Sequence, residues 1–117
     1  MTVFFAAIAA FVSIALGAFG AHGLEGKVDA KALAWWDTAT FYLLTHAVAA
    51  LAIGLSGKGG LYQAGALISL GGAALFATTL YAMAIGAPRW LGAVTPIGGL
   101  GMLAGWALVA FAVFQSR

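Results

Sequence analysis

The chain has 117 residues, of which five are basic, three are acidic and 64% are hydrophobic. Charged residues make up only 7% of the chain, against roughly 25% in an ordinary soluble domain. Because so few polar side chains cannot cover a water-soluble globule, the composition excludes a soluble enzyme, a nucleic-acid-binding protein and a disordered tail. The chain has no cysteine, which excludes disulfides, zinc-thiolate sites, iron–sulfur clusters and a cysteine nucleophile.

Four segments are apolar over the length of about 20 residues that a bilayer-crossing helix needs. The predicted spans cover residues 3–24, 35–55, 61–85 and 95–114. Helices joined by short loops pack as antiparallel neighbours. The sequence therefore predicts an all-α fold, an up-down bundle of four transmembrane helices that forms a single transmembrane domain over residues 1–117.

The ends of the chain are expected on the same side of the membrane, because the number of crossings is even. The first span could instead be a cleaved signal peptide, since Ala18 and Gly20 offer a small-residue cleavage pattern. Its apolar run is too long and is not preceded by Lys or Arg, which favours a retained span. We predict an inner-membrane location. Three basic residues on one side against two on the other leave the orientation undecided.

Small residues recur at helical spacing, and in lipid they allow helix backbones to approach closely. The packing residues that we predict are Gly17 and Ala21 in the first span, Gly65 and Ser69 in the third, and Gly98, Gly101 and Gly105 in the fourth. We expect these residues to hold the bundle together. Alternatively, some of these small residues form a face that contacts a second copy of the chain or another membrane protein.

One end of the bundle, where the first and third loops meet, is expected to collect the polar residues. The residues assigned to that end are His22, Glu25, Lys27, Asp29, Lys31, Asp37, Thr38, Tyr42, Tyr81, Arg89, Trp90 and Thr95. Trp35, Trp36 and Trp90 are expected to form an aromatic belt at the membrane interface. The first loop alternates acidic and basic residues over 25–31, which is compatible with a short interfacial helix or with a solvated connector.

His46 is the most informative residue, because it is expected about 16 Å deep at 1.5 Å per residue, near the midplane of the bilayer. Tyr42 and Thr38 lie above it on the same helix face. An ionisable side chain at this depth is a functional candidate by default. The structural alternative is a neutral His46 that hydrogen-bonds across helices, with a partner among Ser13, Ser69 and Thr78.

His22 and Asp37 are both expected near one interface, where the carboxylate would fix the tautomer of the imidazole. The alternative is a hydrogen bond that only orders the loop. His22 and His46 differ in depth by about 13 Å at 1.5 Å per residue, which is too far to share an iron. We therefore predict no metal, haem or other cofactor.

Thr95 and Pro96 are expected to be the N-cap and the first helical residue of the fourth span. The free amides there would suit an anion such as a lipid phosphate, with Arg89 and Trp90 nearby. The alternative is a capped helix whose glycines serve packing. No nucleophile motif and no carboxylate inside the membrane core is present, so the sequence predicts neither an enzyme nor a proton-coupled exporter.

Four motifs run along the chain: GAFGAHGL at 17–24, WDTATFYLLTHA at 36–47, LY at 80–81 and TPIGGLGMLAGW at 95–106. In these motifs the sequence resembles the YgdD family, small multi-pass bacterial inner-membrane proteins with relatives in eukaryotes and a domain of unknown function. The resemblance implies a multi-pass inner-membrane protein with a retained first span. It implies no activity, substrate or catalytic residue.

Three functional hypotheses follow. The leading one is a non-enzymatic accessory or interaction module in the lipid bilayer, with a homo-oligomer or another membrane protein as partner. The second is a protein that binds a lipid or a small amphiphile in a polar pocket, for which the lining residues would be His22, Asp37, Thr38, Tyr42, His46, Arg89 and Thr95. The third, small-solute transport, is disfavoured because the membrane core holds no carboxylate.

Overall fold

The computed structural model describes residues 1–116 and consists of four long helices. The elements in chain order are α1 (Thr2–Phe19), the π-helical turn η1 (Gly20–Leu24), α2 (Ala30–Leu55), α3 (Leu61–Ala84), the 3₁₀ segment η2 (Arg89–Ala93) and α4 (Thr95–Gln115). With their short extensions, all four helices are long and apolar enough to cross a membrane. The predicted all-α architecture is confirmed.

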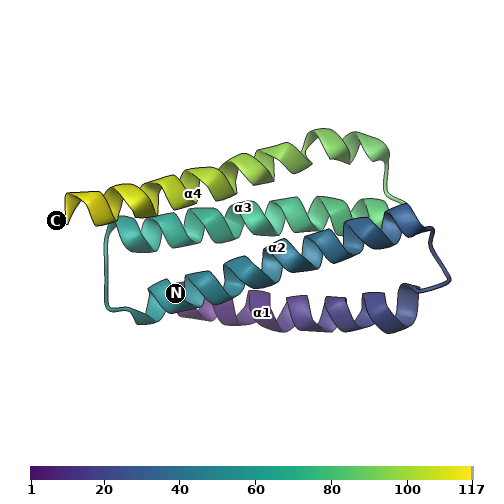
Figure 1. Ribbon diagram of the computed structural model, residues 1–117, viewed down its shortest axis with the longest axis horizontal. Coiled ribbons are helices and arrows are strands. Elements are labelled where there is room, and N and C mark those ends of the chain that lie inside the picture. The colour runs from purple at the N-terminus through teal and green to yellow at the C-terminus, as the bar shows by residue number, and fades with distance from the viewer. Residues whose placement is uncertain (117) are drawn as a thin grey trace.

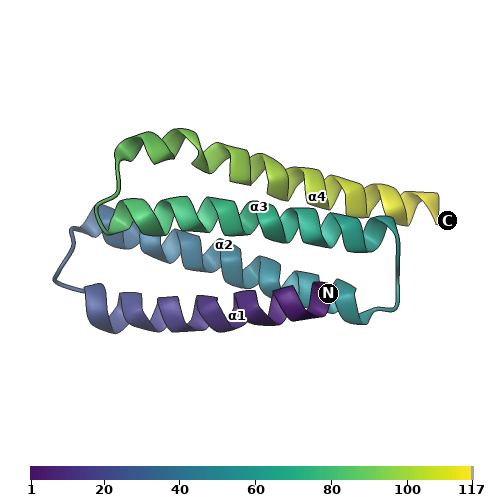
Figure 2. The same cartoon turned by 180° about the vertical axis from the view of Figure 1, so that it is seen from behind.

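The helices run antiparallel, and each lies beside its neighbour in the chain (Figure 1). The view from behind shows the same order, with α3 between α2 and α4 (Figure 2). The N-terminus and the end of α4 lie at one end of the bundle, and the α1–α2 and α3–α4 connections lie at the other. The molecule measures 51 × 26 × 18 Å, so its long axis exceeds the roughly 30 Å hydrocarbon core.

The bundle is open along one side, because among residues 1–116 the backbone of α4 packs only against α3 and η2. α3 packs against both α2 and α4, and α1 packs mainly against α2. Large hydrophobic side chains point outward, including those of Phe11 and Leu103, residues with 74% and 69% of their surface exposed. An apolar exterior over helices with internally bonded backbones suits hydrocarbon as the surrounding medium.

α2 begins at Ala30 rather than near residue 35, because Asp29 caps the helix. The backbone of Asp29 is extended, and its carboxylate accepts a hydrogen bond from the amide of Ala32 at 2.8 Å. An acceptor at this position satisfies one of the free amides of the first turn. Of the charged residues at 25–31, Lys31 lies in α2 and Asp29 caps it, whereas Glu25 and Lys27 lie in the connection between η1 and α2, and no separate interfacial helix forms among the described residues.

The contact between α3 and α4 is built from glycines that face the partner backbone. A Cβ atom at Gly98 would lie 2.5 Å from the amide nitrogen of Phe76, and one at Gly105 would lie 2.6 Å from the carbonyl oxygen of Gly65. Gly101 faces Gly72, and a Cβ there would lie 3.0 Å from the Cα of Gly72. Any larger residue at these points would force the helices apart.

Gly72 is a packing residue that the sequence did not single out. A Cβ atom there would lie 2.6 Å from the amide nitrogen of Met102. Ser69, on the same face of α3, is fully buried and donates a hydrogen bond to the carbonyl oxygen of Met102 at 3.3 Å. The predicted packing residues Gly65 and Ser69 both face Gly105 in this interface, and Gly72 continues the same face of α3.

The indole of Trp36 holds α1 against α2. Its Nε1 donates to the carbonyl oxygen of Leu16 at 2.7 Å, and a Cβ atom at Gly20 would lie 2.6 Å from the same nitrogen. Gly17 also faces α2, where a Cβ would lie 3.1 Å from the Thr40 methyl group. Ala21 is exposed, because the wider π turn that begins at Gly20 interrupts the regular helical spacing.

Candidate functional site

His46 and Trp106 form a hydrogen-bonded pair that links α2 to α4 inside the membrane span. The indole Nε1 of Trp106 donates to Nε2 of His46 at 3.0 Å. The other ring nitrogen, Nδ1, lies 2.7 Å from the carbonyl oxygen of Tyr42, which can only accept. The network therefore assigns a neutral imidazole with its proton on Nδ1.

A cavity of about 350 Å³ lies beside this pair, between α2 and α4. Most of its walls are aromatic or aliphatic, and the lining residues are Tyr42, His46, Phe76, Gly99, Met102, Leu103 and Trp106. The ring of Tyr42 packs edge-on against Phe76, with 4.8 Å between the ring centroids. The cavity is thus a mostly aromatic recess, and the imidazole in its wall already has partners at both nitrogens.

The predicted partners of His46 have other roles. Ser13 donates to the carbonyl oxygen of Ala9 at 2.7 Å within its own helix, and Ser69 bonds to α4 as described above. Thr78 lies in a separate groove. The partner that sequence reasoning missed is Trp106. A Trp in the interior of an apolar span was the available signal, because a buried indole N–H usually finds an acceptor.

Thr95 does not act as an N-cap. Its hydroxyl lies 2.7 Å from that of Thr79 and donates to the carbonyl oxygen of Leu91 at 3.2 Å. The cap position is Val94, which has helical backbone angles because η2 leads directly into α4. A capping side chain needs an extended backbone, and here the hydroxyl instead ties α4 to α3.

A second hydroxyl pair, absent from our predicted site, lies near the same end of the bundle. The hydroxyls of Thr40 and Tyr81 are 2.6 Å apart and join α2 to α3. The ring of Tyr81 also packs against Trp36, with 4.4 Å between the ring centroids. Both residues belong to the motifs quoted above, and both act on helix packing.

The remaining predicted site residues do not converge on one pocket. His22, Asp37 and Thr38 are exposed, and the hydrogen bonds of the described residues do not join His22 to Asp37. Arg89 lies over the ring of Trp35, with Cζ 5.0 Å from the ring centroid. Across the part of the chain that the structure describes, no group of three or more His, Cys, Asp or Glu side chains is placed to hold a metal ion.

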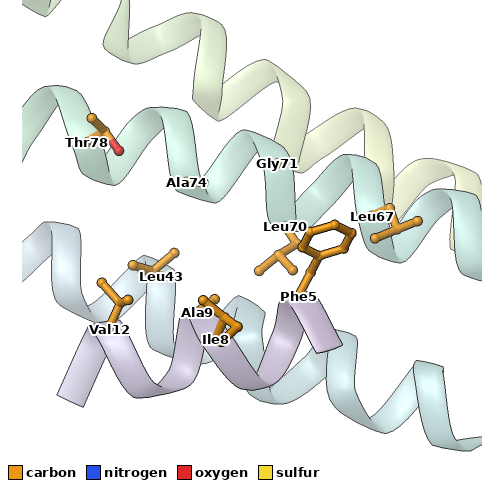
Figure 3. A pocket seen from close by; sticks show the side chains of 10 residues that line it. All are labelled: Phe5, Ile8, Ala9, Val12, Leu43, Leu67, Leu70, Gly71, Ala74 and Thr78. Atoms are coloured by element: carbon orange, nitrogen blue, oxygen red, sulfur yellow. The ribbon is translucent and has the colours of Figure 1, made fainter. Parts of the chain in front are cut away.

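A larger groove, of about 450 Å³, opens between α1 and α3 on the surface (Figure 3). It is almost entirely apolar, and its lining residues are Phe5, Ile8, Ala9, Val12, Leu43, Leu67, Leu70, Gly71, Ala74 and Thr78. The side chain of Leu43 on α2 lies between the two flanking helices, and the small residues of α3 leave the space above it open (Figure 3).

These features define a small multi-pass α-helical membrane protein. The sequence pattern of the family described as "Protein of unknown function (DUF423)" matches residues 16–99, and the chain belongs to this family. The chain is 41% identical over 114 residues to the UPF0382 membrane protein YwdK of Bacillus subtilis, covering 93% of this chain and 92% of the relative.

Further relatives have the same description. A UPF0382 membrane protein of Haemophilus influenzae is 42% identical over 113 residues, covering 95% of this chain and 91% of the relative. One of Schizosaccharomyces pombe is 39% identical over 108 residues, covering 87% of this chain and 92% of the relative. No solved structure matches the chain significantly. The prediction of a small integral membrane protein of unknown activity is confirmed.

Proposed function

We propose that the protein is a non-enzymatic accessory module, a single transmembrane domain of the inner membrane that receives an apolar helix of a partner protein in the groove between α1 and α3. The groove itself is the observation that carries the proposal. The groove has a volume of about 450 Å³ and is almost entirely apolar, and helices associate in lipid by close packing of such surfaces.

The shape of the groove supports a helix as its occupant. Its α3 side presents Gly71 and Ala74, and a Cβ atom at Gly71 would meet nothing within 4 Å. Small residues let a second helix approach the backbone closely, which is the main source of helix association in lipid. Phe5 and Leu67 rise on either side and would interdigitate with the partner's side chains (Figure 3).

The use of polar groups inside the spans supports a non-enzymatic role. The hydroxyls of Ser13 and Ser69 donate to backbone carbonyls, and both ring nitrogens of His46 have partners. Among the described residues, every buried side-chain nitrogen or oxygen atom has a hydrogen-bond partner. A catalytic group would need free donor or acceptor capacity facing a substrate.

The helical architecture supports the inner membrane, since proteins of bacterial outer membranes are typically β-barrels. An even number of crossings supports termini on one side. The excess of three basic residues over two that is expected from the sequence is too small to assign that side.

Site-specific photo-crosslinking tests the accessory role. A photoreactive phenylalanine replaces Ala74 in the groove, and a matched control replaces Val48, an outward residue of α2 with 57% of its surface exposed. The expected result is a discrete protein adduct at position 74 and only lipid adducts at position 48. Doubling of the mass would identify the partner helix as a second copy of the chain. Lipid adducts alone at position 74, or equal protein adducts at both positions, would contradict the proposal.

A second candidate is the binding of a small amphiphile, which the aromatic cavity beside His46 favours. Brominated amphiphiles test it, because a bromine in the cavity would quench the fluorescence of Trp106. In a chain whose other three tryptophans are replaced by Phe, so that Trp106 alone reports, quenching should be weaker when Leu103→Phe narrows the cavity, and unchanged quenching would contradict binding there.

A further inference from the structure

Two cationic side chains share one aromatic ring at the α1–α2 and α3–α4 end of the bundle. Nζ of Lys31 lies 5.6 Å, and Cζ of Arg89 lies 5.0 Å, from the ring centroid of Trp35. Lys31 precedes Trp35 by one turn of α2, so the two lie on the same face of that helix. Arg89 comes from η2, on the other connection. The ring therefore gathers positive charge from two separate loops.

The cations are available for a ligand. Lys31 and Arg89 are exposed, and Trp35 is half-buried. Within residues 1–116 neither cation forms an ion pair. The nearest acid in sequence, Asp29, uses its carboxylate to cap α2. Two exposed cations beside one ring raise the local positive potential, which attracts an anion.

The cluster also lies at the depth where phospholipid phosphates are found. Trp35 stands in the first turns of α2, and Trp90, next to Arg89, has 67% of its surface exposed. Trp side chains gather at the headgroup level of a bilayer. Basic clusters at this level recognise anionic headgroups, and Arg adds bidentate bonding to phosphate oxygens.

We propose that Lys31 and Arg89, positioned by the ring of Trp35, bind the phosphate of an anionic phospholipid headgroup. This site is separate from the groove between α1 and α3, so it does not rest on the proposed function. The two cations favour a headgroup with net negative charge over a zwitterionic one, whose own cation they would repel.

Native mass spectrometry of the full chain, released from nanodiscs that contain equal amounts of phosphatidylglycerol and phosphatidylcholine, tests the site. Wild type should retain phosphatidylglycerol in preference. Lys31→Gln and Arg89→Gln should each weaken its binding about fivefold, the loss expected for one basic residue at a membrane surface. The conservative pair Lys31→Arg and Arg89→Lys should keep the preference, which separates charge recognition from a general loss of folding.

Lys58→Gln is the matched control. Lys58 lies 5.7 Å from the ring centroid of Tyr62 at the other end of the bundle, where it is the single cation on that ring among residues 1–116. This variant should bind phosphatidylglycerol as wild type does. An equal loss in Lys58→Gln, or full retention in the Lys31→Gln/Arg89→Gln double variant, would overturn the proposal. Binding of inorganic phosphate to lipid-free wild type as tightly as phosphatidylglycerol would also overturn it, because the site would then recognise the free anion and not a lipid headgroup.

Discussion

The packing of α4 on α3 depends on glycines that face the partner backbone, and Gly98→Ala tests this dependence. A Cβ atom at position 98 would lie 2.5 Å from the amide nitrogen of Phe76 and 2.7 Å from the carbonyl oxygen of Gly72. At the adjacent Gly99, a Cβ atom would meet nothing within 4 Å. Gly99→Ala is therefore a control in the same helix with the same change in composition.

The magnitude follows from the distance that the helices must move. Ordinary van der Waals contact begins at 3.4 Å, so a contact of 2.5 Å requires a separation of 3.4 − 2.5 = 0.9 Å. The opposing atoms belong to the backbone and cannot rotate away. Overpacking of this kind costs about 1–3 kcal/mol, and a gap of this size also forfeits contacts along the interface. We expect Gly98→Ala to be less stable than Gly99→Ala by about 3 kcal/mol, the upper end of that range.

The measurement is reversible unfolding by sodium dodecyl sulfate in mixed micelles, followed by circular dichroism. Both variants gain the intrinsic preference of alanine for helix, so their difference isolates the packing cost. The α3 side offers the same comparison. A Cβ at Gly72 meets the α4 backbone, whereas one at Gly71 meets nothing within 4 Å. Equal stability of Gly98→Ala and Gly99→Ala would refute the assignment of this interface.

Three further changes test single contacts in the same unfolding assay. Trp106→Phe removes the donor to Nε2 of His46 and should lower the free energy of unfolding by about 1 kcal/mol. An unchanged value would mean that the pair does not stabilise α4. Asp29→Ala removes the cap of α2 and should cost about 1 kcal/mol, whereas Asp37→Ala, at an exposed position, should stay within about 0.5 kcal/mol. Trp36→Phe removes the indole bond to the α1 backbone and should cost about 1 kcal/mol. Faster hydrogen exchange at the end of α1 should accompany that loss, and protection equal to wild type would count against the bond.

The number and order of the helices could be predicted because they depend on properties that run along the chain. Apolar length defines a span, and short loops impose antiparallel order. The α2–α3 connection illustrates this. Gly57 and Gly60 have φ values of 79° and 56°, which glycine adopts readily, and α3 begins at Leu61, where the third span was expected to start.

The partners of the polar side chains could not be predicted in the same way. Their identity depends on how each helix is rotated about its axis, and antiparallel order does not specify that rotation. Trp106 is the partner of His46 because α4 packs on α3 with its glycine face, which turns the indole towards α2. The hydrophobic pattern gives little help, because in lipid the outer face of a helix is as apolar as the inner one.

Local backbone geometry limited the prediction at two further points. The π turn at Gly20–Leu24 changes the helical spacing, so the residue that meets α2 is Gly20 instead of Ala21. η2 continues into α4, so the residue before Thr95, Val94, already has helical backbone angles, and Thr95 does not cap the helix. A contact with a neighbouring helix accompanies each feature: the indole of Trp36 packs on Gly20 in the first case, and the hydroxyl of Thr79 bonds to that of Thr95 in the second.

The polar groups that have hydrogen-bond partners, and those that have none, indicate where a ligand or partner can bind. Among the described residues the buried polar atoms are all paired, so a ligand that engaged one of them would first have to break a bond between helices. Such a bond in a membrane interior is lost without compensation from water. Binding is therefore expected at groups that make no bond between helices. One such place is the α1–α3 groove, where no side chain of residues 1–116 covers the backbone at Gly71. The other is the headgroup level, where Lys31 and Arg89 lie beside one ring without an anion.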